Sequence, residues 1–298
     1  MNCAPTEKFQ KLQKIIRSYE KVVIAFSGGC DSAFVLKVSV DVLGRKNVKA
    51  VLAKSPSLPE SELLDARDTA GEIGADLEII ETNEMENPNY VSNPVNRCYF
   101  CKSELYLHLL PKAQEFGAGH ILNGTNLDDL GDWRPGLKAA GEQDIKSPLI
   151  EAGMKKEDIR SASKLLGLST WSKPQAACLS SRIPFGIEIT EERLRQVEKG
   201  EEILKNLGFE MVRVRWAEKR ATVEVGAEET RIFFKSQEIR EKALNALKTL
   251  GFQSVDLSLQ GYRSGLFNPK SSLRKAVKAG SPRPIYKGAE TAPLQAKK

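Results

Sequence analysis

The sequence has no apolar run long enough to cross a bilayer. Near its start, the longest uninterrupted stretch of aliphatic and aromatic residues is Val22 to Phe26, whereas a membrane-spanning helix needs about 20 residues. The first twenty residues also lack the apolar core and the cleavage site of a signal peptide. We therefore expect a cytoplasmic protein with no membrane partner.

Cysteine is scarce, and its number is odd. The five cysteines are Cys3, Cys30, Cys98, Cys101 and Cys178. This number argues against a disulfide framework and favours thiolate or metal chemistry in a reducing compartment. A zinc site of four cysteines needs two CxxC pairs, and the chain has one. His108 could be a further ligand, but its position beside Leu105 on an amphipathic helix favours a packing role.

The net charge of +6 is not spread evenly along the chain. From Arg263 to Lys298 there are nine basic residues and one acid, Glu290, so this tail carries +8 and the remaining 262 residues carry about −2. The body has no basic stripe, and we expect no nucleic-acid partner. A flexible, solvated end is the simpler interpretation of tail 263–298, and a contact with RNA or another anion is the alternative.

Short β-branched runs alternate with helical patterns in the first part of the chain. The expected strands are Lys21–Phe26, Val48–Ala53, Leu77–Ile80 and His120–Asn123, and the expected helices are Ala33–Leu43, Pro59–Ile73, Lys102–Phe116 and Lys155–Leu166. This alternation predicts an α/β fold with a doubly wound parallel sheet, which binds ligands at the carboxyl ends of its strands.

The pattern changes after residue 182. A charged helix (Thr190–Leu207), two strands (Glu210–Trp216 and Ala221–Val225), a helix ending near Leu250 and a strand (Gln253–Leu259) are expected. This order predicts a second, smaller α+β domain. The expected division is therefore a large domain at 1–182, a small domain for substrate binding or oligomerisation at 183–262, and a flexible basic tail at 263–298.

A glycine turn joins the first strand to the first helix. In the segment SGGCDS, Gly28 and Gly29 let the backbone wrap around a phosphate, the hydroxyls of Ser27 and Ser32 add donors, and the helix N-terminus favours an anion. The chain has no Gly-Lys dipeptide, so the turn is not a Walker-type loop. It resembles the PP-loop of the ATP pyrophosphatases, which implies ATP in the turn and Asp31 near Mg²⁺.

The remaining cysteines lie in turn-rich segments. Cys98 and Cys101 form a CxxC just before the predicted helix from Lys102, where a helix N-terminus would lower the pKa of a thiol. Cys178 lies in an irregular stretch that can fold back over the sheet. We assign Cys30, at the variable position of the loop motif, a packing role.

Five segments together resemble one family. SGGCDS, NPVNRCYFCKSELY, NGTNLDDLGDWRPG, SPLIEAGMKKEDIR and KPQAACLSSRIPFG, in this order, are similar to the LarE-type sulfur transferases, and the resemblance spans about Lys21 to Leu259. It implies that ATP adenylates a carboxylate of pyridinium-3,5-biscarboxylic acid mononucleotide and that sulfur displaces AMP, first on one carboxylate and then on the other. Adenylation is needed because a free carboxylate resists a sulfur nucleophile. The product serves nickel-pincer cofactor biosynthesis of the lactate racemase type.

The same resemblance leaves two sources of sulfur. In one branch the cysteine at the position of Cys178 gives up its own sulfur and becomes dehydroalanine. In the other, three thiolates hold a [4Fe-4S] cluster whose fourth iron carries a sulfide. Because Cys98, Cys101 and Cys178 are all present, the resemblance favours the cluster, loaded by sulfide or another sulfur donor. Zinc and an unmetallated thiol remain alternatives.

Basic residues are the further candidates for the site. Lys102 and Arg182 lie close in sequence to the cysteines and could neutralise a carboxylate or a phosphate, or be solvated surface charges. Arg213 and Arg215 lie on one face of a strand and match an RVR element with which the family binds the substrate's phosphate; an exposed strand face is the alternative.

An acidic turn follows the fourth strand. Asp128 and Asp129 could bind Mg²⁺ or ribose, or cap a helix. Trp133 and Arg134 match the DWRPG segment, which by itself indicates no role.

Three other functions match part of the sequence. A tRNA thiolase also joins a PP-loop to three cysteines, but it requires an RNA-binding body. An amide-forming ligase and a nucleotide sensor have no use for the cysteines. The family resemblance also implies a homo-oligomer.

Overall fold

The computed structural model describes residues 6–131 and 134–262. The expectations for tail 263–298, Cys3 and Trp133 therefore fall outside the described residues. Within the described ranges, no helix is long and apolar enough to cross a membrane.

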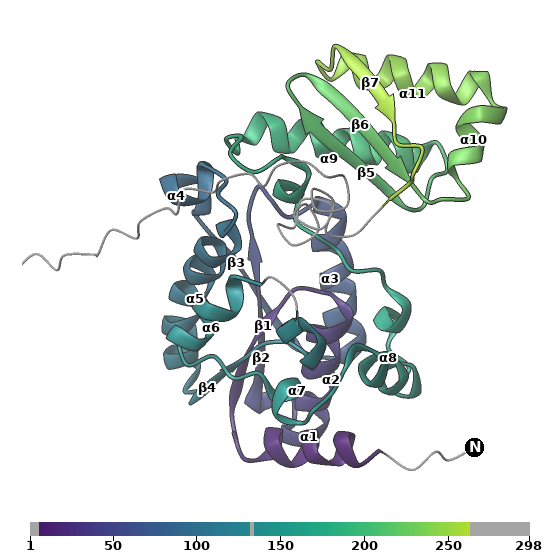
Figure 1. Ribbon diagram of the computed structural model, residues 1–298. Coiled ribbons are helices and arrows are strands. Elements are labelled where there is room, and N and C mark those ends of the chain that lie inside the picture. The colour runs from purple at the N-terminus through teal and green to yellow at the C-terminus, as the bar shows by residue number, and fades with distance from the viewer. Residues whose placement is uncertain (1–5, 132–133, 263–298) are drawn as a thin grey trace, which may run out of the picture. The chain divides into compact units, whose positions relative to one another are not determined.

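A four-stranded parallel sheet forms the centre of the first part of the chain (Figure 1). Its strands are β1 (Val22–Phe26), β2 (Val48–Lys54), β3 (Asp76–Glu81) and β4 (His120–Leu122), in the order β3-β2-β1-β4. Val22 of β1 is in register with Val48 on one side and with His120 on the other. The winding direction reverses between β1 and β4, and ligands bind in such sheets at the carboxyl end of this reversal.

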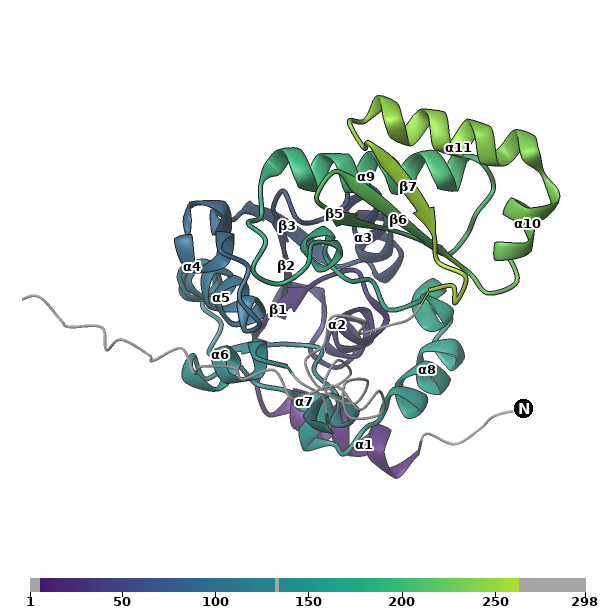
Figure 2. The same ribbon diagram turned by 45° about the horizontal axis from the view of Figure 1, so that its top comes forward.

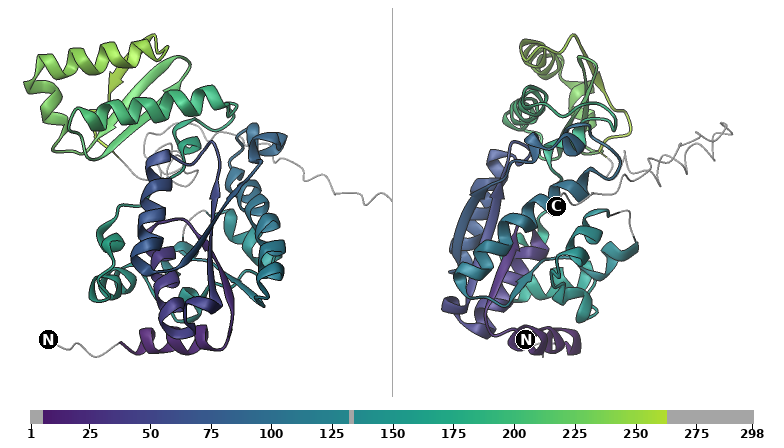
Figure 3. Two further views of the ribbon diagram at one scale, coloured as in Figure 1. Left: turned by 180° about the vertical axis from the view of Figure 1, so that it is seen from behind. Right: turned by 90° about the vertical axis from the view of Figure 1, so that its left-hand side faces the viewer.

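Helices cover both faces of the sheet, because alternate strand residues point to opposite faces (Figure 3). Val22 and Ile24 of β1 pack with α1 (Glu7–Arg17), α2 (Cys30–Leu43), α3 (Glu60–Ile73) and α8 (Lys156–Leu165). Val23 packs with α5 (Arg97–Phe116) and α6 (Gly136–Glu142) on the other face. This arrangement confirms the predicted α/β fold with a doubly wound parallel sheet.

Short elements complete this part. They are α4 (Pro88–Val91), α7 (Pro148–Glu151) and the 3-10 turns Arg45–Asn47, Glu84–Glu86, Leu127–Gly131, Ser169–Ser172 and Leu179–Arg182.

A second, smaller sheet with its own hydrophobic core follows (Figure 2). It consists of β5 (Val212–Ala217), β6 (Arg220–Val225) and β7 (Ser254–Leu257), with β5 antiparallel and β7 parallel to β6. The helices are α9 (Glu191–Asn206), α10 (Thr230–Lys235) and α11 (Gln237–Thr249). Leu194 and Leu247 are buried in the same core as Val214. The structure therefore contains the smaller α+β arrangement that the sequence predicts.

Two helices begin earlier than the sequence predicts. α5 begins at Arg97 instead of Lys102, so Cys98 and Cys101 lie inside its first turns and not before it. α2 begins at Cys30 instead of Ala33, because Gly29 takes the extended conformation of an N-cap residue.

Candidate active site

The glycine turn between β1 and α2 is tightly packed. Gly28 has a φ of +68°, and a Cβ on it would lie 2.5 Å from the Cβ of Ala66 in α3, so both conformation and space require glycine. The Ser27 backbone N–H donates to Ser32 Oγ at 3.2 Å, and the two hydroxyl oxygens are 3.0 Å apart. The first N–H groups of α2 have no acceptor within the helix, and they can therefore bind an anion.

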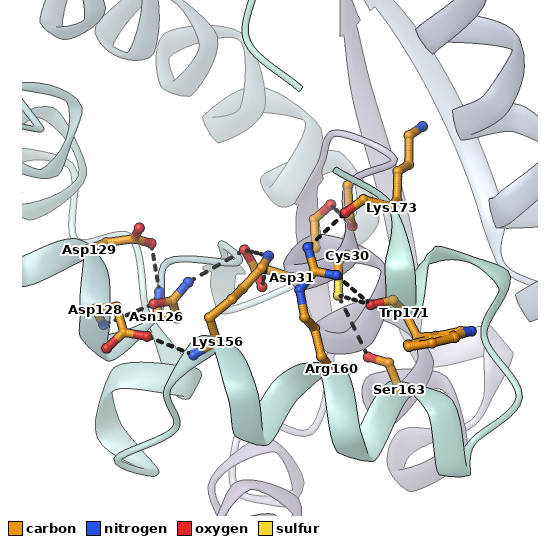
Figure 4. A network of polar contacts seen from close by, with 12 residues as sticks. Cys30, Asp31, Asn126, Asp128, Asp129, Lys156, Arg160, Ser163, Trp171 and Lys173 are labelled. Carbon is orange, nitrogen blue, oxygen red and sulfur yellow. Dashed lines mark hydrogen bonds and ion pairs between the residues drawn. The ribbon is translucent and has the colours of Figure 1, made fainter. Parts of the chain in front are cut away.

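Asp31, in the first turn of α2, is the centre of a polar network (Figure 4). Lys156 Nζ lies 2.7 Å from both carboxylate oxygens of Asp31, and Asn126 Nδ2 is 3.4 Å from one of them. Lys156 is the first residue of α8. Sequence reasoning missed it, although it lies in the SPLIEAGMKKEDIR segment, because only the fold brings it to Asp31.

The acidic turn after β4 supports this network. Asp128 accepts a hydrogen bond from the Lys156 backbone N–H at 2.9 Å, so it caps α8, which is one of the alternatives left open above. Asp129 is buried, accepts from the Asn126 N–H and pairs with Arg134 at 2.8 Å. A Cβ on Gly124 would lie 2.7 Å from the Ser32 backbone nitrogen, so this loop packs directly on the N-terminus of α2.

The Cys30 side chain packs toward α8 and the 3-10 turn Ser169–Ser172. It is buried, and its sulfur lies 4.0 Å from Ser163 Oγ and from the Trp171 carbonyl oxygen (Figure 4). Burial raises the pKa of this thiol. The predicted packing role is confirmed.

The segment that carries Cys178 is bound to the same edge of the sheet. The Leu179 N–H donates to the carbonyl of Ser57, which follows β2, at 2.8 Å. The Tyr90 hydroxyl and Ser180 Oγ are 2.7 Å apart. Because β1 and β2 are adjacent and parallel, the turn after β1 and the Cys178 segment both lie at the carboxyl edge.

Cys98, Cys101 and Cys178 act on one another electrostatically. Desolvation by burial and, to a smaller extent, the Glu84 carboxylate raise the pKa of Cys101, which reaches about 12. The charges of Cys178 and Cys98 contribute smaller amounts to this rise. The expected lowering at a helix N-terminus is therefore wrong for both cysteines of the pair. Desolvation by burial raises the pKa of Cys98 and of Cys101, and the charge of Lys102 only partly offsets this. Among residues 6–131 and 134–262, no three His, Cys, Asp or Glu side chains are arranged to hold a single metal ion.

Lys102 and Arg182 differ in their surroundings. Lys102 is exposed, one turn after Cys98, and acts electrostatically on all three thiols. Arg182 is 2% exposed and binds both carboxylate oxygens of Glu201 at 2.8 Å, with further bonds to the carbonyls of Ala177 and Cys178. Its charge is neutralised within the protein. These bonds hold Arg182 against the Cys178 segment, and its expected role toward the substrate stays a prediction.

The two arginines of β5 lie on one face but have different partners. Arg215 is buried, and its Nε and Nη2 lie 3.1 and 3.0 Å from Glu224 Oε2. Arg213 donates to the Val212 carbonyl and lies over the Tyr262 ring at 5.1 Å. Among the described residues it has no carboxylate partner, and burial together with the Arg182 charge lowers the pKa of Arg213. Arg213 therefore has the charge that remains available to an anion.

His108 takes no part in the cysteine site. Its Nε2 is 3.0 Å from Glu104 Oε1, and the side chain is 38% exposed. His108 is thus half-buried, and its ring is bonded to an acid one turn earlier on the same helix.

Comparisons with known proteins cover most of the chain. The sequence model of the NAD synthase family matches residues 7–91, which contain the glycine turn. An uncharacterised protein of Synechocystis sp. is 45% identical over 88% of this chain and 97% of its own length. An uncharacterised protein of Methanocaldococcus jannaschii is 31% identical over 82% and 92% of the two lengths.

A third relative has a named activity. The pyridinium-3,5-bisthiocarboxylic acid mononucleotide synthase of Lactiplantibacillus plantarum is 36% identical over 88% of this chain and 93% of its own length. The similarity extends through both sheets, beyond the part shared with NAD synthases. The chain therefore belongs to the family of this synthase, the LarE-type ATP-dependent sulfur transferases of the PP-loop class.

Proposed function

We propose that this protein uses ATP to adenylate the carboxylates of pyridinium-3,5-biscarboxylic acid mononucleotide and replaces an oxygen of each by sulfur, for a nickel-pincer cofactor of the lactate racemase type. The observation that carries the proposal is the near full-length similarity to a synthase whose name describes the bisthiocarboxylic product. The location of the PP-loop turn and of the Cys178 segment at one edge of the sheet supports it.

The residues around the turn suit the adenylation step. A carboxylate oxygen of the substrate attacks the α-phosphorus of ATP, the bond to pyrophosphate breaks, and pyrophosphate leaves on the N–H groups of α2. Asp31 would hold Mg²⁺, which neutralises phosphate charge when bound. Asp31 then no longer pairs with Lys156, whose ammonium is 2.7 Å away, and Lys156 becomes available to the phosphates.

The second step is the attack of sulfur on the acyl carbon, which releases AMP together with one carboxylate oxygen. The thiols of Cys98, Cys101 and Cys178 are donors of the kind that a [4Fe-4S] cluster takes, and Cys98 and Cys101 lie together in the first turns of α5. When bound, the cluster would supply an iron with an open coordination position for sulfide. Sacrifice of the Cys178 sulfur is the alternative route.

Arg213 is our proposed ligand for the phosphate of the mononucleotide. Its guanidinium has no carboxylate partner among the described residues, and a charge-assisted bond to phosphate is among the stronger contacts available to it. We also propose a homo-oligomer, and the exposed apolar side chains of Phe234 in α10 and of Leu259 after β7 support it as contact residues.

An anaerobic assay with Mg-ATP, the biscarboxylate mononucleotide and sulfide tests the proposal. We expect AMP, pyrophosphate and thiocarboxylate to form in equal amounts, measured by chromatography and mass spectrometry. ADP as the nucleotide product, or AMP without any thiocarboxylate, would count against it.

A further inference from the structure

Asn93, in the loop between α4 and α5, is a fully buried polar residue with an unusual backbone conformation. Its exposed fraction is 0%, and its φ is +53°. Few residues other than glycine adopt this left-handed conformation, and asparagine is one of them. Asn93 belongs to the NPVNRCYFCKSELY segment, and the proposed reaction gives it no part.

The Asn93 side chain binds one backbone segment, residues 183–189, which we call the connector because it joins the turn Leu179–Arg182 to α9. Its Nδ2 lies close to three connector carbonyl oxygens, those of Pro184 at 2.8 Å, Ile187 at 2.9 Å and Ile183 at 3.3 Å. On the other side, its Oδ1 accepts a hydrogen bond from Arg97. A guanidinium can only donate and a carbonyl can only accept, so these partners require this orientation of the amide.

Backbone hydrogen bonds add to this attachment. The Gly186 N–H donates to the Asn93 carbonyl at 2.9 Å, and the Ile189 N–H donates to the Val91 carbonyl at 2.8 Å. The connector is irregular in conformation, so these contacts supply the partners that a helix or a sheet would otherwise give its polar groups. The loop before α5 therefore holds the connector, mainly through Asn93.

The connector leads directly to groups that we propose for the substrate. It follows Arg182, and the helix after it, α9, carries Glu201. Glu201 binds Arg182 and accepts a hydrogen bond from the Val214 N–H in β5 at 3.1 Å. Val214 is the neighbour of Arg213, our proposed phosphate ligand. A displaced connector would therefore move α9 and, through Glu201, the strand that carries Arg213.

We propose that Asn93 is a positioning residue for the mononucleotide: by holding the connector against the loop before α5, it fixes Arg213 where the phosphate of the substrate binds. This inference rests on the proposed function, because it takes that phosphate as the ligand of Arg213. ATP binding is independent of Asn93, since the glycine turn is formed by β1 and α2.

Two substitutions remove the bonds to the connector in different ways. Asn93→Asp keeps the size of the side chain and the acceptor for Arg97, but it turns a carboxylate oxygen toward the connector carbonyls. Asn93→Gly accepts the positive φ without strain and removes every side-chain bond. Asn89→Asp is the matched control, because Asn89 is exposed on the neighbouring α4.

Steady-state AMP formation by the full-length variants gives one KM for the mononucleotide and one for ATP. The loss of two hydrogen bonds shifts the equilibrium between a bound and a released connector by about 5- to 150-fold. We therefore expect both Asn93 variants to raise the KM for the mononucleotide at least about fivefold, to keep the KM for ATP within about twofold, and the control to change neither. Circular dichroism shows that each variant is folded at the assay temperature.

A folded Asn93→Asp protein with the wild-type KM for the mononucleotide would overturn the proposal, and so would an equal rise of both KM values. Hydrogen exchange of the wild-type protein decides the question if neither variant folds. The mononucleotide should then slow exchange of the backbone amides of 183–189 severalfold, and Mg-ATP alone should not. Exchange that the mononucleotide leaves unchanged would also overturn the proposal.

The same assays separate this inference from the proposed function. If the wild-type protein forms no AMP with the mononucleotide, the proposed function is wrong, and the role of Asn93 is wrong with it. If the wild-type protein is active and both variants behave like it, only the role of Asn93 is wrong.

Discussion

Arg213 and Arg215 lie two residues apart on one face of β5. We predict that changing Arg215 to Met lowers the stability of the protein, whereas changing Arg213 to Met weakens substrate binding. Arg215→Met removes both hydrogen bonds that Arg215 makes to Glu224. The Glu224 carboxylate, which is 3% exposed, then stays buried without these bonds. Breaking a buried pair in this way costs about 3–5 kcal/mol. For a chain of this size, that lowers the Tm by roughly 6–20 °C.

Arg213→Met removes no bond to a buried carboxylate, so we expect the Tm to fall by no more than about 2 °C. The loss of one charge-assisted bond to phosphate, about 1.5–3 kcal/mol, should instead raise the KM for the mononucleotide roughly 10- to 100-fold while the KM for ATP stays constant. Thermal unfolding and steady-state kinetics with each substrate measure the two effects.

The double variant Arg215→Met/Glu224→Met is the control for the stability effect. Removing both members of a buried pair leaves no unpaired buried charge, so the Tm of the double variant should rise most of the way back to the wild-type value. The reasoning is refuted if Arg213→Met leaves the KM for the mononucleotide unchanged, or if it lowers the Tm as far as Arg215→Met does.

Three further predictions concern the glycine turn and the cysteines. Asp31→Asn should reduce AMP formation at least 100-fold, whereas Asp41→Asn on the exposed side of the same helix should leave AMP release unchanged; equal rates for the two variants would refute the magnesium role. Gly28→Ala should lower the Tm and weaken ATP binding, because its Cβ has no space and the φ is positive, and Gly119→Ala, which meets nothing within 4 Å, should do neither. The pKa of Cys101 is raised to about 12, so the folded, metal-free protein holds a proton that the unfolded chain releases near pH 9; stability should fall between pH 9 and 12 in urea titrations and fall less in Cys101→Ala.

Local patterns were sufficient to predict the sheet. The β-branched runs at β1 and β2, the glycine turn and the helical spacing after it each indicate one element, and together they predict a parallel, doubly wound order. The start of α5 was harder to place, since Pro94 and Asn96 read as loop residues while the helix begins directly after them.

The partners of the site residues could not be predicted from local patterns. Lys156 and Asp31 are 125 residues apart in sequence. The pairing of Arg182 with Glu201 depends on how the 3-10 turn Leu179–Arg182 packs against α9. For this reason the sequence indicated that Arg182 carries a charge near Cys178, but not that this charge is already neutralised. The family resemblance, confirmed over nearly the whole chain, supplied the substrate class.

The number of thiocarboxylates formed per chain tests the central claim most directly. Anaerobically reconstituted protein, given Mg-ATP, the biscarboxylate mononucleotide and excess sulfide, is analysed for thiocarboxylate by mass spectrometry against the protein concentration. We predict more than one sulfur transfer per chain, with the mass of the chain unchanged. At most one transfer, with a loss of about 34 Da from the chain as Cys178 becomes dehydroalanine, would contradict a renewable sulfur carrier on the three cysteines, and no thiocarboxylate at all would contradict sulfur transfer to this substrate.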